Sequence, residues 1–226
     1  MHISYLITCS NEEESLKNLL YRVRDNIDTE DEMVVILDSE RVDNKKTKQI
    51  LKTFGGSDDW YHLHPLSNNY SEHKNWGAQQ CQYEWIFQLD GDELPTETLV
   101  INIKDIITLN PDIEAFWIPR INDFRGVTEQ HAMQWGWRLS MSPTYKRPIV
   151  NWHDPQCRLF MNKPEIKWVG RLHERIQGNK TFVYLPADED LAIYHDKTIE
   201  KQVETNLKYN KLFTEKENQG FKLPTG

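Results

Sequence analysis

Cysteine is scarce in this chain of 226 residues, which contains three: Cys9, Cys81 and Cys157. They lie far apart, and no pair has the CxxC spacing of a zinc site or a dithiol redox centre. An odd number of scattered cysteines also offers no disulfide framework. The sequence therefore predicts reduced thiols, and with them a protein of a reducing compartment such as the cytoplasm.

Long apolar runs and an excess of basic residues are missing as well. The first apolar run covers residues 3–8, too short to span a membrane, and no basic segment precedes it as in a signal peptide. We therefore predict a cytoplasmic protein without a transmembrane segment, free to work at the inner face of a membrane. The 35 Asp and Glu outnumber the 27 Lys and Arg. Because nucleic acid is bound by basic surfaces, we expect no nucleic-acid partner.

The first half of the chain alternates β-rich apolar segments with segments of helical periodicity. Strands are predicted at 3–8, 33–38, 60–64 and 85–90, and helices at 10–27, 44–54, 71–82 and 96–109. Two of these helices have predicted capping residues, Ser10 with Glu13 in one and Ser71 in the other. Such alternation requires right-handed crossovers between parallel strands. The predicted fold class is therefore α/β, with a Rossmann-type, mainly parallel sheet flanked by helices.

The second half loses this regular alternation. Short strands are predicted at 114–120, 157–161 and 181–185, and residues 121–152 are predicted to be irregular. The spacing of Ile199, Val203, Leu207 and Leu212 predicts a C-terminal helix. Because neither a linker nor an internal repeat interrupts the chain, we predict a single domain over residues 1–226.

Acidic residues end two of the predicted strands. Asp38 ends one, and Asp90 ends the other within "WIFQLDGDELP". In doubly wound sheets, ligands bind outside the carboxyl ends of the strands. The Asp90-Gly91-Asp92 turn holds two carboxylates close together, and hard divalent cations stabilise such a group. The alternative is a merely acidic approach to the 96–109 helix, whose N-terminus favours negative charge.

Several motifs follow one another in a specific order: a strand before Asn-Glu-Glu, a strand ending in Asp, "SEHKNWGAQQCQYEWIFQLDGDELP", and later "GRLHE". This order resembles family-two glycosyltransferases of the GT-A fold, in particular the bacterial and phage enzymes that decorate lipopolysaccharide cores and other glycans. The resemblance is dense over residues 3–100 and 155–212, and thin over 120–152. It implies a nucleotide-sugar-binding half at 1–112 and an acceptor-binding half with the C-terminal helix at 113–226.

The resemblance assigns the nucleotide to the turn after the first strand. Cys9, Ser10 and Asn11 occupy the turn that holds the base in this family, although Ser10 replaces the usual stacking aromatic residue. Asp38 resembles the aspartate that contacts the base or the ribose. A UDP-sugar is the favoured donor.

Further matching positions imply a diphosphate and a metal site. Lys74 and Asn75 stand where the family has basic and amide residues near the nucleotide. Asp90 would contact the ribose or bind at the metal, Asp92 would ligate Mn²⁺ or Mg²⁺, and His195 matches a position close to nucleotide or metal. A structural histidine is the alternative for His195. Independently of family, cleavage of a sugar–diphosphate bond leaves negative charge on the leaving group, which a divalent cation and a nearby lysine stabilise.

The segment "GRLHERI" implies the catalytic base. By resemblance, Glu174 takes the proton from the acceptor hydroxyl, and His173 is a further metal or phosphate contact. If the segment is a strand, the two adjacent side chains point to opposite faces and only one of them reaches the site. Asp154 and Asp123 are the rival bases, because such roles fall to carboxylates in a cleft.

Aromatic residues in the second half form a candidate acceptor surface. Trp135, Trp137 and Trp152, together with Arg138, could stack against the apolar faces of sugar rings. Core packing is the alternative for these side chains.

These features together predict a metal-dependent enzyme that transfers a sugar from a nucleotide-diphosphate sugar to a hydroxyl of a glycan or lipopolysaccharide-type acceptor, with inversion as the resemblance implies. One alternative is a nucleotidyltransferase that makes nucleotide-sugars, but "TCSNEEES" lacks the glycine-rich phosphate loop of such enzymes. The other alternative is a non-catalytic carbohydrate-binding protein, against which the intact acidic cluster argues.

Overall fold

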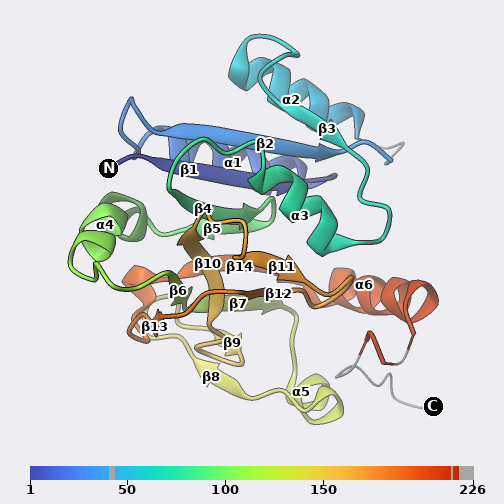
Figure 1. Ribbon diagram of the computed structural model, residues 1–226. Coiled ribbons are helices and arrows are strands. Elements are labelled where there is room, and N and C mark those ends of the chain that lie inside the picture. Colours follow the sequence, from blue (N-terminus) through green and yellow to red (C-terminus); the bar gives the residue numbers. More distant parts are fainter. Residues whose placement is uncertain (41–43, 215, 219–226) are drawn as a thin grey trace.

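The computed structural model describes residues 1–40, 44–214 and 216–218. The first half builds one side of a large sheet and the helices that cover it (Figure 1). Its elements are β1 (Ile3–Cys9), α1 (Glu13–Arg24), β2 (Glu32–Asp38), α2 (Lys45–Gly55), β3 (His62–His64), α3 (Tyr70–Ala78), β4 (Trp85–Asp90), β5 (Glu93–Pro95) and α4 (Glu97–Thr108).

The second half completes the large sheet, adds a smaller one and ends in a helix (Figure 1). Its elements are β6 (Ala115–Ile118), β7 (Arg120–Arg125), α5 (Glu129–Trp135), β8 (Leu139–Met141), β9 (Pro148–Val150), β10 (Gln156–Met161), β11 (Lys167–Val169), β12 (Arg175–Gln177), β13 (Phe182–Tyr184), the 3-10 helix η1 (Glu189–Leu191), β14 (Ile193–Thr198) and α6 (Ile199–Leu212).

The large sheet has the strand order β13-β6-β10-β4-β1-β2-β3. β1 pairs in parallel with β2 and β4, and β2 pairs in parallel with β3, whereas β10 runs antiparallel between β4 and β6. The register places Thr8 of β1 opposite Asp90 of β4, and Asp38 at the end of β2 opposite His64. The predicted fold class, a mixed and mainly parallel sheet flanked by helices, is therefore confirmed.

A second sheet has the strand order β5-β14-β7-β9-β8. β14 pairs antiparallel with β5 and parallel with β7. Because β5 follows β4 directly after Gly91 and Asp92, the chain passes from one sheet to the other within this turn. The turn that the sequence analysis singled out is thus the covalent link between the two sheets.

The prediction that residues 121–152 are irregular was wrong. This segment holds most of β7 together with α5, β8 and β9. β8 and β9 are three residues long each, and β7, "RINDFR", mixes buried polar and apolar side chains. Neither pattern produces the alternation by which a half-exposed strand is predicted.

Helix starts and helix faces also differ from prediction at three places. α1 has Glu12 as its N-cap without a side-chain cap, so the predicted capping box of Ser10 is absent there. α3 begins after Asn69, whose side chain accepts a hydrogen bond from the backbone N–H of Glu72, and not at Ser71. α6 forms as predicted, but Leu207 on its expected buried stripe is 42% exposed.

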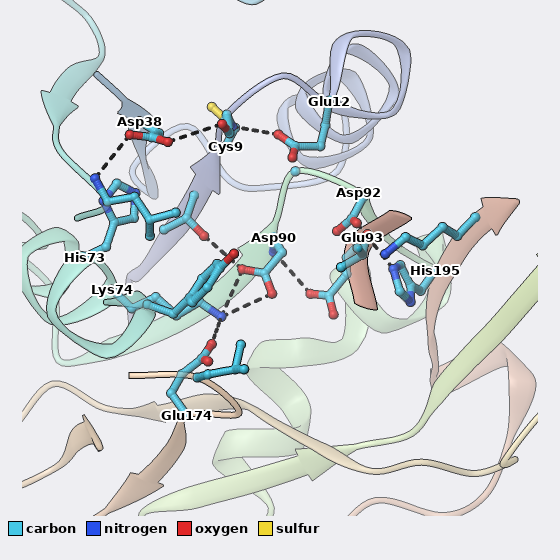
Figure 2. A pocket seen from close by; sticks show the side chains of 18 of the residues that line it. Cys9, Glu12, Asp38, His73, Lys74, Asp90, Asp92, Glu93, Glu174 and His195 are labelled. Atoms are coloured by element: carbon cyan, nitrogen blue, oxygen red, sulfur yellow. Dashed lines mark hydrogen bonds and ion pairs between the residues drawn. The ribbon is translucent and has the colours of Figure 1, made fainter. Parts of the chain in front are cut away.

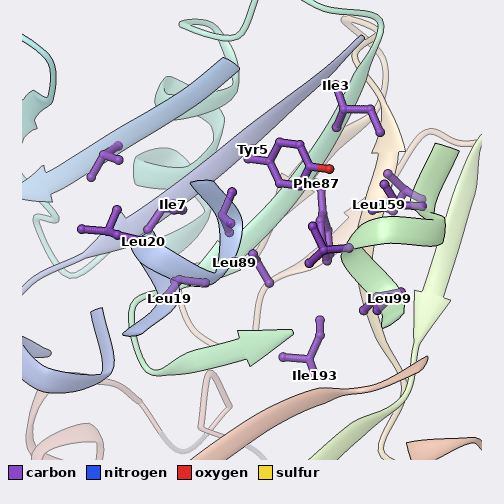
Figure 3. Close-up of a cluster of buried hydrophobic side chains, with 14 of the residues drawn as sticks. Ile3, Tyr5, Ile7, Leu19, Leu20, Phe87, Leu89, Leu99, Leu159 and Ile193 are labelled. Atoms are coloured by element: carbon purple, nitrogen blue, oxygen red, sulfur yellow. The ribbon is translucent and has the colours of Figure 1, made fainter. Parts of the chain in front are cut away.

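The main hydrophobic core lies between the large sheet and helices α1 and α4 (Figure 3). Alternate residues of β1 and β4 face this core, as the period of two in a strand requires. The predicted apolar stripe of α1 packs against them. The fully buried members include Ile3, Tyr5, Ile7, Leu16, Leu19, Leu20, Val23, Phe87, Leu89 and Leu99.

Replacement of Phe87 by alanine tests how much this core contributes to the stability of the protein. Phe87 is fully buried on β4 and stacks edge-on against Tyr5 at 5.8 Å between ring centroids. We expect Phe87→Ala to lower the free energy of unfolding by about 3–5 kcal/mol, because it removes buried apolar area and leaves a cavity. Urea denaturation followed by circular dichroism measures the free energy of unfolding. Ile101→Ala, at a site 57% exposed on α4, should change stability by less than about 0.5 kcal/mol.

All three cysteines are free and buried. Burial raises the pKa of the Cys81 and Cys157 thiols to about 12, so they stay protonated and unreactive at neutral pH. These are the reduced thiols that the sequence predicts. No helix in the described part of the chain is long and apolar enough to cross a bilayer.

Candidate active site

A cavity of about 530 Å³ lies at the edge of the large sheet where β1, β2 and β4 end (Figure 2). Side chains from the β1–α1 turn, α3, the 172–174 segment, β14 and α6 form its walls. The sequence-predicted site residues that line it are Cys9, Ser10, Asn11, Asp38, Lys74, Asp90, Asp92, His173, Glu174 and His195. Residues spread over most of the chain therefore meet in one hollow.

Asp90 accepts hydrogen bonds on both of its carboxylate oxygens. Its Oδ1 accepts hydrogen bonds from Thr8 Oγ1 at 2.9 Å and Gln88 Nε2 at 3.0 Å. Its Oδ2 accepts from Arg158 Nη2 at 2.7 Å and from Lys74 Nζ at 3.1 Å. Burial alone would raise the pKa of Asp90, but the two cations hold it well below the ordinary value. Both oxygens are already occupied, which suits an acceptor of hydrogen bonds better than a direct metal ligand.

Lys74 links Asp90 to Glu174 (Figure 2). Its side chain is 4% exposed, and its Nζ lies 3.0 Å from Asp90 Oδ1 and 2.7 Å from Glu174 Oε1. Burial lowers the pKa of this ammonium, but the two carboxylates raise the pKa by more than burial lowers it, and the net shift is upward. Lys74 also lies over the Trp168 ring, 4.8 Å from its centroid. The cavity therefore contains a permanently charged, desolvated cation.

Asp92 and His195 face each other from the inter-sheet turn and β14, with 3.3 Å between Asp92 Oδ2 and His195 Nε2. On the other side of the ring, Nδ1 lies 3.0 Å from Asn122 Oδ1. That amide oxygen is an acceptor, because the amide nitrogen donates to Asp154 at 2.8 Å. Nδ1 must therefore carry a proton, and a neutral ring presents the lone pair of Nε2 to the Asp92 carboxylate.

Two facing lone-pair donors need a positive charge between them. Either a proton on Nε2 or a metal ion satisfies this need. With a protonated His195, burial of Asp92 raises the pKa of its carboxyl, but the imidazolium lowers it more. A divalent ion such as Mn²⁺ would be held there by the Asp92 carboxylate and the His195 imidazole, and it would supply positive charge to a phosphate ligand. The described residues hold no cluster of three or more His, Cys, Asp or Glu that could bind a metal by themselves. The Asp92–His195 pair therefore fits a metal only if a ligand supplies further donor atoms.

Comparison with known proteins decides the family. The model of the family described as "Glycosyl transferase family 2" matches residues 4–168. The chain belongs to glycosyltransferase family 2. No curated protein sequence matches it significantly.

Solved structures with the same fold include TarS of S. aureus. A TarS structure has 15% sequence identity and a TM-score of 0.57, and the match covers 91% of this chain and 38% of that one. TarS 1-349 in complex with UDP-GlcNAc has 17% identity and a TM-score of 0.57, covering 87% and 59%. TarS 1-349 in complex with UDP has 16% identity and a TM-score of 0.55, covering 91% and 63%. The family 2 chain described here thus spans less than two thirds of these TarS chains, and the likeness is one of fold.

The side of the cavity at the end of β2 centres on Asp38. It is buried and accepts hydrogen bonds from the backbone N–H of Leu66 at 3.1 Å and from Ser10 Oγ at 3.4 Å. The thiol of Cys9 turns inward toward the carbonyl oxygen of Ile36, at 3.6 Å. The Cys9–Asn11 turn therefore presents its backbone and the Ser10 hydroxyl to the cavity, without an aromatic ring.

Several predicted residues lie outside the set that lines the cavity, as the described residues form it. The Asn75 side chain donates from Nδ2 to the Trp168 carbonyl oxygen and accepts at Oδ1 from the Trp168 backbone N–H, each at 2.8 Å, and so fastens α3 to β11. Asp154 accepts hydrogen bonds from Arg120 and Asn122. Burial raises the pKa of Asp154, but Arg120 lowers it more, and the net shift is downward. Asp123 is held by Tyr194 and Arg147.

The candidate acceptor tryptophans pack against other rings and apolar side chains. Trp135 lies 4.6 Å from Trp137 between ring centroids, and Trp137 lies 5.1 Å from Phe124. Trp152 packs on the small core of the second sheet, and Arg138 donates to its carbonyl oxygen. These four predicted residues also lie outside the cavity lining formed by the described residues.

Sequence reasoning missed two acidic or basic groups at the cavity edge. Glu12 is half-buried beside Gly91, where desolvation and then the charge of Asp92 raise the pKa of its carboxyl. Lys197, two residues beyond His195 on β14, lines the cavity, and burial lowers the pKa of its ammonium. Glu12 was one of three consecutive glutamates, and nothing in "NEEE" distinguishes the member that points inward.

Two arginines were also missed. Arg158 on β10 and Arg120 on β7 both line the cavity and both bind the buried carboxylate of Glu93, at 2.5 and 3.2 Å. One signal was available for Arg158, since a charged residue inside the apolar run "CRLFM" must find a buried partner. The identity of that partner could not be predicted, because it lies 65 residues away.

Proposed function

We propose that this chain transfers a sugar from a nucleotide-diphosphate sugar to a glycan hydroxyl, inverting the anomeric carbon, with a divalent metal ion as cofactor. The observation that carries the proposal is the meeting of Asp92, His195, Lys74 and Glu174 in one cavity at the carboxyl ends of the parallel strands. This edge is where doubly wound sheets bind nucleotides. Membership of glycosyltransferase family 2 supports the reaction class.

A UDP-sugar is the proposed donor. The Cys9–Asn11 turn and the buried Asp38 would hold the uridine, in keeping with the UDP and UDP-GlcNAc complexes of TarS, which shares the fold. Asp90 would contact the ribose, and its charge is already balanced by Lys74 and Arg158. This division leaves Asp92 for the diphosphate end of the donor.

Asp92 and His195 would hold Mn²⁺ or Mg²⁺, which when bound supplies positive charge to the diphosphate leaving group. The nitrogen donor favours Mn²⁺ of the two. Lys197 lines the same wall and would add positive charge to the leaving group without moving during the reaction. His173, by contrast, has its Nε2 3.2 Å from Asn218 Oδ1, which supports a role in positioning the 172–174 segment.

Glu174 is the proposed base. The acceptor oxygen would form a bond to the anomeric carbon while the bond from that carbon to the diphosphate oxygen breaks, and the hydroxyl proton would pass to Glu174. Its side chain is 13% exposed and lines the cavity. Asp154 and Asp123 lie outside the lining formed by the described residues, and they form ion pairs with Arg120 and Arg147. Lys74, whose Nζ lies 2.7 Å from Glu174 Oε1, would hold the Glu174 side chain in place until the acceptor arrives.

A nucleotide screen tests this proposal. We expect UDP to raise the melting temperature in the presence of Mn²⁺ more than GDP, CDP or dTDP does, and to have little effect without the metal. At a ligand concentration about 100 times Kd, the added stability is about 2.7 kcal/mol. Slow release of UDP from one of a panel of UDP-sugars should follow. If glycans raise the melting temperature and nucleotides with Mn²⁺ do not, the chain is a carbohydrate-binding protein. If it releases pyrophosphate from UTP and a sugar phosphate, it is a nucleotidyltransferase.

A further inference from the structure

We propose that Arg158 is a positioning residue for the transfer reaction: it fixes the Gly91–Asp92 turn, and thereby the separation of Asp92 from His195. This role rests on the proposed function, because it concerns the same donor site. Arg158 does not itself need to touch the donor. Its effect would pass through the two carboxylates that flank the turn.

The guanidinium of Arg158 binds the chain on both sides of that turn. It donates to Gln88 Oε1 at 2.6 Å and to Asp90 Oδ2 at 2.7 Å, both on β4. It also donates to Glu93 Oε1 at 2.5 Å, on β5. The other oxygen of Glu93 accepts from the backbone N–H of Asp90 at 3.1 Å. The turn is thus closed by one cation from the large sheet and by one internal hydrogen bond (Figure 2 shows the carboxylates).

The anchored turn determines where Asp92 stands relative to β14. Glu93 lies directly opposite His195 in the β5–β14 pairing, and Asp92 immediately precedes it. Arg120 of β7, the other neighbour of β14, holds the same Glu93 carboxylate at 3.2 Å. The distance of 3.3 Å between Asp92 and His195 therefore depends on how Glu93 is held.

An arginine is required at this position by geometry as well as by charge. Its planar fork can bind acceptors on two strands at once, whereas the ammonium of a lysine is a single point. The side chains of Arg158 and Glu93 are 4% and 1% exposed. Without the cation, the buried carboxylate of Glu93 and the partly exposed carboxylate of Asp90 would lose a shared partner and repel each other across the turn.

Two substitutions separate positioning from a general contribution to stability. Arg158→Lys keeps the charge and loses the fork, and Arg158→Met loses both. UDP binding in the presence of Mn²⁺ would be measured by isothermal titration calorimetry, at a temperature where circular dichroism shows each variant folded. We expect UDP affinity to fall about tenfold or more in Arg158→Met and by a smaller factor in Arg158→Lys, as for other residues that orient metal ligands. The Mn²⁺ concentration for half-maximal UDP binding should rise in both.

Lys104→Met is the matched control. Lys104 also pairs with a buried carboxylate, Asp31, at 2.8 Å, but on the α4 side of the molecule and outside the cavity lining. We expect this variant to lose stability while its UDP affinity and Mn²⁺ requirement stay within twofold of the wild type. If Arg158→Met does not fold, the test rests on Arg158→Lys: the Mn²⁺ concentration for half-maximal UDP binding should be higher in this variant than in the wild type.

Three results would overturn the inference, and they can be told apart. Folded Arg158 variants with wild-type UDP affinity and Mn²⁺ requirement would show that Arg158 contributes stability alone. A change in Lys104→Met equal to that in Arg158→Met would show that any lost buried ion pair has this effect. Absence of Mn²⁺-dependent UDP binding in the wild type would instead refute the proposed function, and this inference with it.

Discussion

Asp92→Ala is expected to abolish metal-dependent nucleotide binding while leaving the fold intact. Asp92 supplies the carboxylate that faces His195, and its side chain is 30% exposed to the cavity, so its removal leaves no void in the core. Without it a metal ion keeps one protein donor, and the diphosphate loses its anchor. The added stability from UDP and Mn²⁺, about 2.7 kcal/mol at 100 times Kd, should fall to nearly zero in a thermal-shift titration.

Asp196→Ala is the control for this prediction. Asp196 is the neighbour of His195 on β14, but its exposed side chain pairs with Arg125 at the surface. This variant should respond to UDP and Mn²⁺ as the wild type does. Mn²⁺-dependent UDP stabilisation of Asp92→Ala at the wild-type level would refute the metal assignment.

Glu174→Gln is expected to lower turnover at least a hundredfold while leaving donor binding unchanged. Glutamine keeps the size of the side chain and an oxygen that can accept the hydrogen bond from Lys74, which lies 2.7 Å from Glu174 Oε1. It cannot take a proton, and general base catalysis contributes roughly 10²–10⁴-fold. Release of UDP from the donor found by the screen measures turnover, and calorimetry with UDP measures binding, which should stay within about threefold.

The rival carboxylates provide the comparison. Asp154→Asn and Asp123→Asn should each retain turnover within about tenfold of the wild type, since both side chains lie outside the cavity lining of the described residues and pair with Arg120 and Arg147. Near-normal turnover of Glu174→Gln, combined with a hundredfold loss in either of these variants, would move the base to that residue.

The sequence predicted the half of the site that rests on buried parallel strands. β1, β2 and β4 are mainly apolar, as buried parallel strands are, and β2 and β4 each end in an aspartate. Asp38 and Asp90 could therefore be placed at one edge without knowledge of the connections. Lys74 could be placed near them because α3 leads into β4.

The remaining half could not be predicted, because it depends on strands that carry little periodicity. His195 reaches Asp92 only because β14 pairs with β5, a strand of three residues. Arg158 reaches Asp90 because β10 inserts antiparallel between β4 and β6, against the alternation of the first half. Asn75 shows the converse: the motif predicts it near the nucleotide, whereas in the structure its amide bonds the Trp168 backbone.

The antiparallel insertion of β10 has a consequence for how the chain acquires its structure. During synthesis Asp90 and Glu93 emerge 68 and 65 residues before Arg158, so the carboxylates of the inter-sheet turn exist for that time without one of the cations that neutralise them. Burial of such charges is costly until the partner arrives. We therefore expect the segment 1–112 to remain incompletely folded on its own, and the centre of the sheet to form late, in one cooperative step, once β10 has docked.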